Sequence, residues 1–253
     1  MNFKVAAAPT PPDTIPPPIP QSELDDLASQ LQSGVSEKQY SAAAAFARLS
    51  LIRENQKPIG ETTGAIPGLV ARLASPLVWI VQAAAAALAS LTHDPGNRTL
   101  IGREHFAIDY LVALLKSPHT VVQEAVAKTL GNLAVKNENK DKIVAIDAVF
   151  TTLVARLKSP HAGVQEAAAL ALSNLIDATN QAKIGKTKGA IPNLVLLLAE
   201  HNPIMVQAAA ATALEKLAGD ASNQAKIANF NALPAIFQIL RNTALVIQRN
   251  TAA

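Results

Sequence analysis

Val122-Gln123-Glu124-Ala125-Val126-Ala127-Lys128-Thr129-Leu130-Gly131-Asn132-Leu133-Ala134 is the segment that decides the fold. Its apolar residues recur three or four positions apart, which places them on one side of an α-helix. The other side carries Glu124, Lys128 and Asn132. If such a helix returns at a fixed interval, no single copy has a core of its own, because each must bury its apolar side against neighbouring copies.

The helix does return, and so does the segment before it. Leu-Val or Leu-rich segments begin at Leu69, Leu111, Leu153 and Leu194, in steps of 42, 42 and 41 residues. The same interval leads outward to residues 27–31 and 236–240. Positions equivalent to Val122 occur once per interval: Lys38, Ile80, Val164, Val206 and Ile247. This period predicts stacked copies of one helical unit.

A third element opens each unit. Asparagines stand four residues before an isoleucine at five places: Asn55, Asn97, Asn139, Asn180 and Asn223. Asparagine is a strong helix N-cap, so we predict a short helix capped by each of these residues. A Gly-Ala-Ile-Pro turn follows at residues 64–67 and 189–192, and Ser-Pro breaks at Ser75, Ser117 and Ser159 precede the long helix.

Three helices in about 42 residues, with this turn and a Val-Gln-Glu-Ala third helix, resemble the armadillo repeat. The resemblance covers residues 21–253. It implies an all-α, right-handed α-solenoid of about five to six stacked three-helix repeats whose third helices line a concave groove. The expected units are 21–51, 52–94, 95–136, 137–178, 179–220 and an incomplete 221–253. HEAT repeats are the nearest alternative, but they lack the short first helix and this turn.

Three features depart from a regular array. Phe106 and Ala148 occupy the turn glycine position, so we expect the first and second helices of those units to join differently. The first unit starts at its second helix, with a polar opening at Ser22 that suits an N-terminal cap. The last unit stops inside its third helix at Ala253, so we expect either a longer biological chain or another protein over this end.

Residues 1–20 differ in composition from the rest. They hold seven prolines, which fix φ and remove backbone donors, so we predict an extended proline-rich arm without a core. Pro9 to Pro12 and Pro17 to Pro20 have PxxP spacing, which suits an aromatic-lined groove. No arginine flanks either motif, which favours a spacer that lies against its own solenoid or a neighbouring protein.

Composition excludes several classes of function. The chain has no cysteine, so it has no disulfides and no cysteine-ligated metal. A formal charge of +3 over 253 residues is too small to indicate nucleic-acid binding. The most apolar run, residues 78–91, is shorter than the roughly 20 residues that span a bilayer. We expect an intracellular protein, cytoplasmic by default, with a processed organellar protein as the alternative.

Catalytic and modification motifs find little support. No two of the five histidines, His93, His105, His119, His161 and His201, form a metal-ligand pair on one helical face. There is no phosphate-binding glycine loop, nucleophile elbow or paired-carboxylate motif, so we expect neither enzyme activity nor a cofactor. The Ser-Pro turns fit proline-directed phosphorylation or plain helix starts. Asn97-Arg98-Thr99 is a glycosylation sequon that we expect to be silent without a secretion signal.

The groove is the expected site of function. Outward positions two, six and ten residues after each Val122 equivalent supply the candidates for a protein-binding groove: Tyr40, Arg48, Gln82, Glu124, Lys128, Asn132, Glu166, Leu170, Asn174 and Lys216. In importin-α proteins, which the family includes, positions six and ten commonly hold Trp and Asn that grip a basic peptide. Here Asn132 and Asn174 match, but position six holds Ala44, Ala86, Lys128, Leu170 and Thr212. The alternative is a merely solvated face.

Three functional interpretations follow. The first is a non-catalytic scaffold or adaptor, such as a stably bound subunit of a hetero-complex, that contacts other proteins through the groove, the arm or the open C-terminal end. The second is an importin-α-like receptor for peptide cargo, which the missing tryptophans disfavour. The third is the interaction domain of a longer enzyme such as a ubiquitin ligase, with any catalytic part outside these residues.

Overall fold

The computed structural model describes residues 19–230 and residue 234, and every regular element within 19–230 is an α-helix. The helices are α1 (Gln21–Leu31), α2 (Ser36–Leu49), α3 (Arg53–Glu61), α4 (Ala65–Arg72), α5 (Val78–Leu91), α6 (Pro95–Arg103), α7 (Ala107–Leu114), α8 (Thr120–Leu133), α9 (Asn137–Val144), α10 (Val149–Arg156), α11 (Ala162–Leu175), α12 (Gln181–Lys186), α13 (Ala190–Leu197), α14 (Ile204–Leu217) and α15 (Ala221–Asn229). Most of the arm, the segment 236–240 and Ile247 lie outside the described residues.

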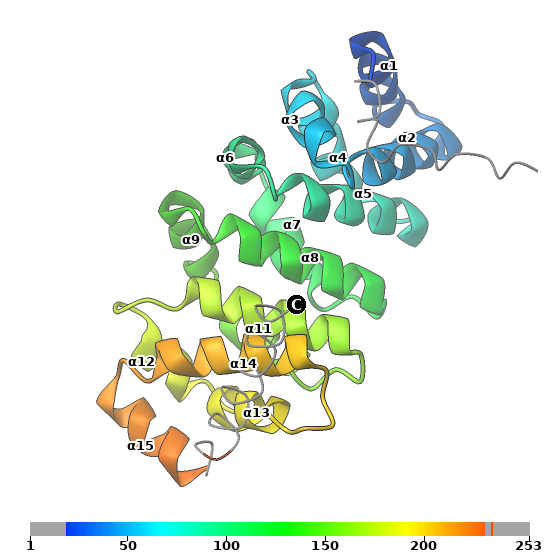
Figure 1. Ribbon diagram of the computed structural model, residues 1–253. Coiled ribbons are helices and arrows are strands. Elements are labelled where there is room, and N and C mark those ends of the chain that lie inside the picture. Colours follow the sequence, from blue (N-terminus) through cyan, green and yellow to red (C-terminus); the bar gives the residue numbers. More distant parts are fainter. Residues whose placement is uncertain (1–18, 231–233, 235–253) are drawn as a thin grey trace, which may run out of the picture.

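The helices follow one another as a pair and then as four triplets, and α15 is the first helix of a sixth unit, as the 42-residue period predicts. We call α1–α2 unit one, α3–α5 unit two, α6–α8 unit three, α9–α11 unit four and α12–α14 unit five. Figure 1 shows the third helices α2, α5, α8, α11 and α14 stacked in chain order, with α3, α6 and α9 along one edge. The molecule is an elongated α-solenoid.

The third helices carry the core. Each has 14 residues, and each packs along the next. Equivalent leucines lie between the layers and are completely or almost completely buried: Leu88, Leu130, Leu172 and Leu214. Small residues allow close approach, since a Cβ on Gly131 would lie 3.1 Å from Cα of Ala171. The many alanines therefore set the spacing between α8 and α11.

The turn glycine position is filled in three ways. Gly64 and Gly189 have φ of 83° and 87°, the left-handed region that favours glycine. Phe106 adopts the same region with φ of 60°, so the expectation that its unit joins differently is wrong. Its ring lies against His105 at 3.7 Å between centroids. Ala148 has right-handed φ and ψ of −81° and −6°, and this unit does join its helices differently.

The prediction that the five asparagines cap the first helices with their side chains is wrong. Asn180 alone occupies an N-cap position, that of α12, and its side chain makes no capping bond there. The side-chain caps of α6 and α15 are Asp94 and Asp220, three residues earlier. Asn97 is instead buried, and its Nδ2 donates to the Gln56 carbonyl of the preceding unit at 2.7 Å and to the Leu91 carbonyl at 3.2 Å. It packs on Gly60, where a Cβ would lie 1.7 Å from its Oδ1.

We call this arrangement the asparagine staple: an asparagine of one first helix donates to a carbonyl of the preceding first helix and covers a glycine there. It recurs with Asn139, which donates to the Arg98 carbonyl at 2.9 Å over Gly102. Asn223 repeats it on the Gln181 carbonyl at 3.0 Å over Gly185. The staples fasten the first-helix edge, while apolar contacts fasten the third helices.

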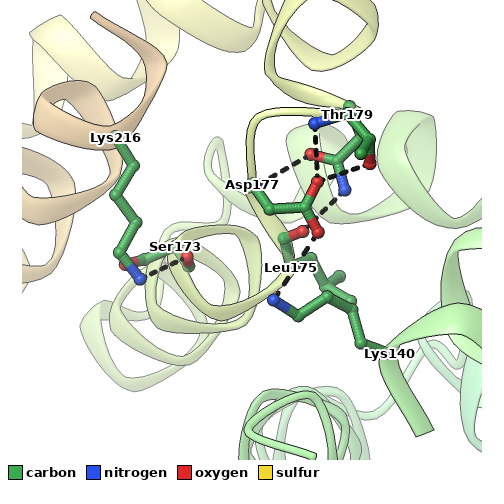
Figure 2. A network of polar contacts seen from close by, with 7 residues as sticks. Lys140, Ser173, Leu175, Asp177, Thr179 and Lys216 are labelled. Atoms are coloured by element: carbon green, nitrogen blue, oxygen red, sulfur yellow. Dashed lines mark hydrogen bonds and ion pairs between the residues drawn. The ribbon is translucent and has the colours of Figure 1, made fainter. Parts of the chain in front are cut away.

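The staple is missing between units four and five. Asn180 Nδ2 donates to the Leu175 carbonyl at 2.8 Å, and its Oδ1 accepts from the Asp177 amide at 3.0 Å, both within the loop. Lys140 Nζ lies 3.6 Å from Asp177 Oδ2 and is the polar link from α9 (Figure 2). Thr179 donates its amide and hydroxyl hydrogens to Asp177 Oδ1 at 3.0 and 2.6 Å.

The Asp177 network predicts a dependence of stability on pH. Partial burial raises the pKa of the Asp177 carboxyl, but hydrogen bonds from Thr179, the charge of Lys140 and a hydrogen bond from Asn180 outweigh it and hold the pKa below its usual value. The carboxylate therefore stabilises the fold above the unfolded pKa of about 3.9, and this contribution is lost as pH falls through the folded pKa.

We expect Asp177→Asn to unfold at lower urea than the wild type at neutral pH, and the gap to close as the pH falls below about 3.9. Urea titrations at several pH values measure it. Thr179→Val, which keeps the carboxylate but removes one donor, should show part of the same loss. A gap of constant size across this range would contradict the assignment.

Candidate functional site

Helix α8 presents a narrow polar strip toward the open side of the stack. Glu124 and Asn132 are half-buried and Lys128 is exposed, whereas the residues between them are buried against α5 and α11. The 3.6-residue repeat of the helix places these three side chains in line. The strip is the centre of the candidate groove.

A first shallow depression of about 310 Å³ lies between α5 and α8. Small residues of α5 form its floor, and Glu124 and Lys128 form its far wall; the complete lining is Ala86, Ala89, Ser90, His93, Val121, Glu124, Ala125 and Lys128. Lys128 Nζ pairs with Glu124 Oε1 at 2.6 Å. A Cβ on Gly163 would lie 2.3 Å from Glu124 Oε2, so this glycine makes room for the carboxylate at the start of α11.

A second depression of about 350 Å³ lies between α8 and α11 and shares His93 and Lys128 with the first. It combines apolar and polar side chains; its lining is His93, Ala127, Lys128, Gly131, Asn132, Glu166, Ala167, Leu170 and Asn174. Because two lining residues are common, the two depressions form one groove across α5, α8 and α11, which we call the central groove.

Side chains at position ten bridge neighbouring third helices. Asn174 Nδ2 donates to the Gly131 carbonyl at 3.0 Å, and Lys216 Nζ donates to the Ser173 carbonyl at 2.8 Å (Figure 2). Asn132 Nδ2 donates to Thr92 Oγ1 at 3.0 Å. Each asparagine keeps its Oδ1 and a second N–H for other partners. These bonds fix the orientation of the amides toward the central groove.

The structure brings together six of the ten predicted residues, Glu124, Lys128, Asn132, Glu166, Leu170 and Asn174, in the central groove. The other four, Tyr40, Arg48, Gln82 and Lys216, do not line it. Tyr40 packs edge-on against Trp79 with ring centroids 5.1 Å apart. Trp79 lies in the first turn of α5.

Several lining residues were not predicted from the sequence, and His93 and Val121 have the largest side chains among them. His93 follows the end of α5, beyond positions two, six and ten, and its Nδ1 lies 2.9 Å from the Ser90 carbonyl. This contact directs Nε2 away from the helix end. Its position in the sequence could have predicted it, because His93 stands three residues after Ser90 and so on the same side of the helix. Val121 stands one residue before Val122, from which positions two, six and ten are counted, and it is 58% exposed.

Within residues 19–230, no three His, Asp or Glu side chains are grouped so as to hold a metal ion. No helix of the described part is long and apolar enough to cross a membrane. The central groove offers one carboxylate without an ion pair among the described residues, one ion pair, two amides and an imidazole beside an apolar floor. This combination suits binding of a polypeptide segment.

Comparisons with known structures address the fold directly. An engineered protein superposes with a TM-score of 0.78 at 28% identity, covering 90% of this chain and 92% of its own. A designed armadillo repeat protein gives a TM-score of 0.76 at 23% identity, covering 85% of this chain and 91% of its own. The chain has an armadillo-repeat fold. This armadillo solenoid also matches the sequence profile of HEAT repeats over residues 108–215.

A further structural neighbour of the armadillo solenoid was determined with a ligand. It is a designed armadillo repeat protein in complex with the peptide (KR)4, with a TM-score of 0.75 and 22% identity, covering 89% of this chain and 98% of its own. At this identity the likeness concerns the fold alone. A search among curated proteins gave no match. Repeat solenoids of this kind are typically protein-interaction scaffolds.

Proposed function

We propose that this armadillo solenoid is a non-catalytic scaffold or adaptor that holds an extended segment of a partner protein along the central groove. The observation that carries the proposal is the continuity of the two depressions, which share His93 and Lys128 across three helices. An extended peptide spans such a surface and exposes its own backbone donors and acceptors. Asn132 and Asn174 can pair with both kinds of group.

The side chains of the groove indicate what such a segment carries. Leu170 is 40% exposed beside Ala127 and Ala167, which suits an apolar side chain of the partner. Glu166 lies in the same depression without an ion pair among the described residues, which suits a cation or a hydrogen-bond donor next to it. Lys128, in contrast, stands between the depressions and opposes a uniformly basic ligand.

An importin-α-like cargo receptor has less support. Position six holds Ala86, Lys128 and Leu170 in the central groove, so no aromatic ladder is present there to stack on lysine side chains. The (KR)4 complex shows that a designed armadillo protein takes a basic peptide, but that binding belongs to the designed protein. A mixed apolar and polar segment fits this groove better.

A substitution at the floor of the groove tests the proposal. Leu170→Arg should fill the second depression and place a cation beside Lys128, so we expect at least about a tenfold loss of affinity, equal to about 1.4 kcal/mol. The probe is a set of peptides selected from a random library on the full chain, with affinity read by fluorescence polarisation. Leu196→Arg is the matched control, because Leu196 is 68% exposed on α13 and lies outside the groove.

Equal affinities of the Leu170→Arg and Leu196→Arg proteins would place peptide binding elsewhere. Cross-linking of native material identifies the natural partner: we expect cross-links at Lys128, in the groove, more than at Lys57 or Lys183 on the first-helix edge. The opposite pattern would move the main interface to that edge.

A further inference from the structure

The asparagine staple requires a glycine as well as an asparagine. The glycine stands five residues after the asparagine of the preceding unit, as Gly60, Gly102 and Gly185 do. In α9 this position holds Val144. At Gly102 even a Cβ would lie 1.9 Å from Asn139 Oδ1, so a valine leaves no room for a staple from the next unit. The sequence of α9 itself therefore excludes the link to α12.

The chain is also one residue shorter at this junction. Six positions separate Leu91 from Asn97, as they do Leu133 from Asn139 and Leu217 from Asn223, but only five separate Leu175 from Asn180. The C-cap residue of α11, Ile176, has an extended backbone conformation, whereas the C-cap residues of α5, α8 and α14 have a right-handed helical one. Helix α12 has six residues, and the other first helices have eight or nine.

A second bond between first helices is lost at the same place. Lys142 Nζ donates to the Gly102 carbonyl at 2.9 Å, and Lys226 Nζ donates to the Gly185 carbonyl at 3.1 Å. The equivalent Lys183 lies over the Phe150 ring instead, with Nζ 5.7 Å from its centroid. No hydrogen bond joins α12 to α9 in the part of the chain that the structure describes.

What remains across the junction is unevenly distributed. On the third-helix side, α11 and α14 pack as closely as their neighbours, and Lys216 bridges to the Ser173 carbonyl. On the first-helix side, the Lys140 and Asp177 pair is 3.6 Å apart, and the Asp177 side chain is 36% exposed (Figure 2). A partly exposed ion pair is weakened by salt and resists opening less than a buried amide bond does.

We propose that the α9–α12 junction is a built-in flex point, at which unit five moves relative to unit four by opening the first-helix edge about the α11–α14 contact. The apolar packing of α11 on α14 acts as the hinge line. Movement there changes the angle between the helices that carry Leu170, Asn174 and Lys216, and so adjusts the end of the concave surface to different partners. The proposal does not depend on which partner binds the central groove.

Pairs of spin labels measure this movement, because the chain has no cysteine of its own. In each first helix, the residue two positions after the isoleucine is exposed. The variant Ala145→Cys with Lys186→Cys places labels across the α9–α12 junction. The variant Glu61→Cys with Arg103→Cys places them at equivalent positions across the stapled α3–α6 junction.

We expect the interlabel distance distribution, from pulsed electron paramagnetic resonance, to be at least twice as wide for the 145–186 pair as for the 61–103 pair. Equal widths would overturn the proposal. A restoring variant, Val144→Gly with one glycine inserted between Ala178 and Thr179, should narrow the 145–186 distribution to that of the control pair. If this variant folds and the distribution stays wide, the missing staple is not what frees the junction.

Discussion

Replacing Leu172 with alanine is expected to lower the free energy of unfolding by about 2–5 kcal/mol. The side chain is completely buried in the middle of α11, which packs on α8 on one side and on α14 on the other. Its neighbours along the helix are alanines, Ala168, Ala169 and Ala171, so few atoms can move in to fill the cavity. In a solenoid each layer contacts only its neighbours, so the loss weakens both interfaces of unit four.

Leu170 on the same helix supplies the control. Two residues from Leu172, it is 40% exposed and faces the central groove, so we expect Leu170→Ala to cost less than about 1 kcal/mol. Urea unfolding followed by circular dichroism measures both variants. If the two alanine variants lose equally little stability, the register that assigns position 172 to the core is wrong.

The sequence predicted the order of helices because the fold has one dominant requirement. Apolar residues at a helical period must be covered by the next copy of the helix, and the 42-residue interval gives the distance along the chain between successive copies. Val122, Val126 and Leu130 are completely buried, as the pattern predicts, while Glu124 and Lys128 remain accessible. Gln123 and Thr129 are buried too, because packing on both neighbours covers more than one side of α8.

The role of the asparagines was not predictable from one unit at a time. An asparagine near the start of a short helix fits the N-cap or the third helical position equally well. The structure places Asn97 and Asn223 at the third position, behind the caps Asp94 and Asp220. The distinguishing clue was the glycine of the preceding unit, and its meaning depends on stacking between units 42 residues apart.

The candidate site was predicted in its centre and missed at its edges. Positions two, six and ten describe the face of a straight helix, and they found the strip on α8 and its counterpart on α11. They also selected Tyr40, which packs on Trp79, and Lys216, which bridges to the Ser173 carbonyl. His93 was not predicted because it follows the end of α5, beyond positions two, six and ten.

The second large effect is expected at Asn97. Its Nδ2 group satisfies two carbonyls, those of Gln56 and Leu91, and the side chain is 1% exposed. Removing it takes this donor from both carbonyls, of which the Leu91 carbonyl keeps the Asp94 amide at 3.1 Å, and opens a cavity over Gly60. Because an unsatisfied buried polar group costs about 1–3 kcal/mol, we expect Asn97→Ala to lower the free energy of unfolding by about 2–4 kcal/mol.

Asn55 separates the staple from the bond that each asparagine makes to the end of the preceding third helix. Unit one has no first helix, so Asn55 donates only to the Leu49 carbonyl at 3.0 Å, and it is 7% exposed. Asn55→Ala should therefore cost about 1–2 kcal/mol, less than Asn97→Ala, when both are measured by urea unfolding. The difference between the two variants is the contribution of the bond between successive first helices. Were the two losses equal, the staple would add no stability, and the regular junctions would be held by their third helices alone.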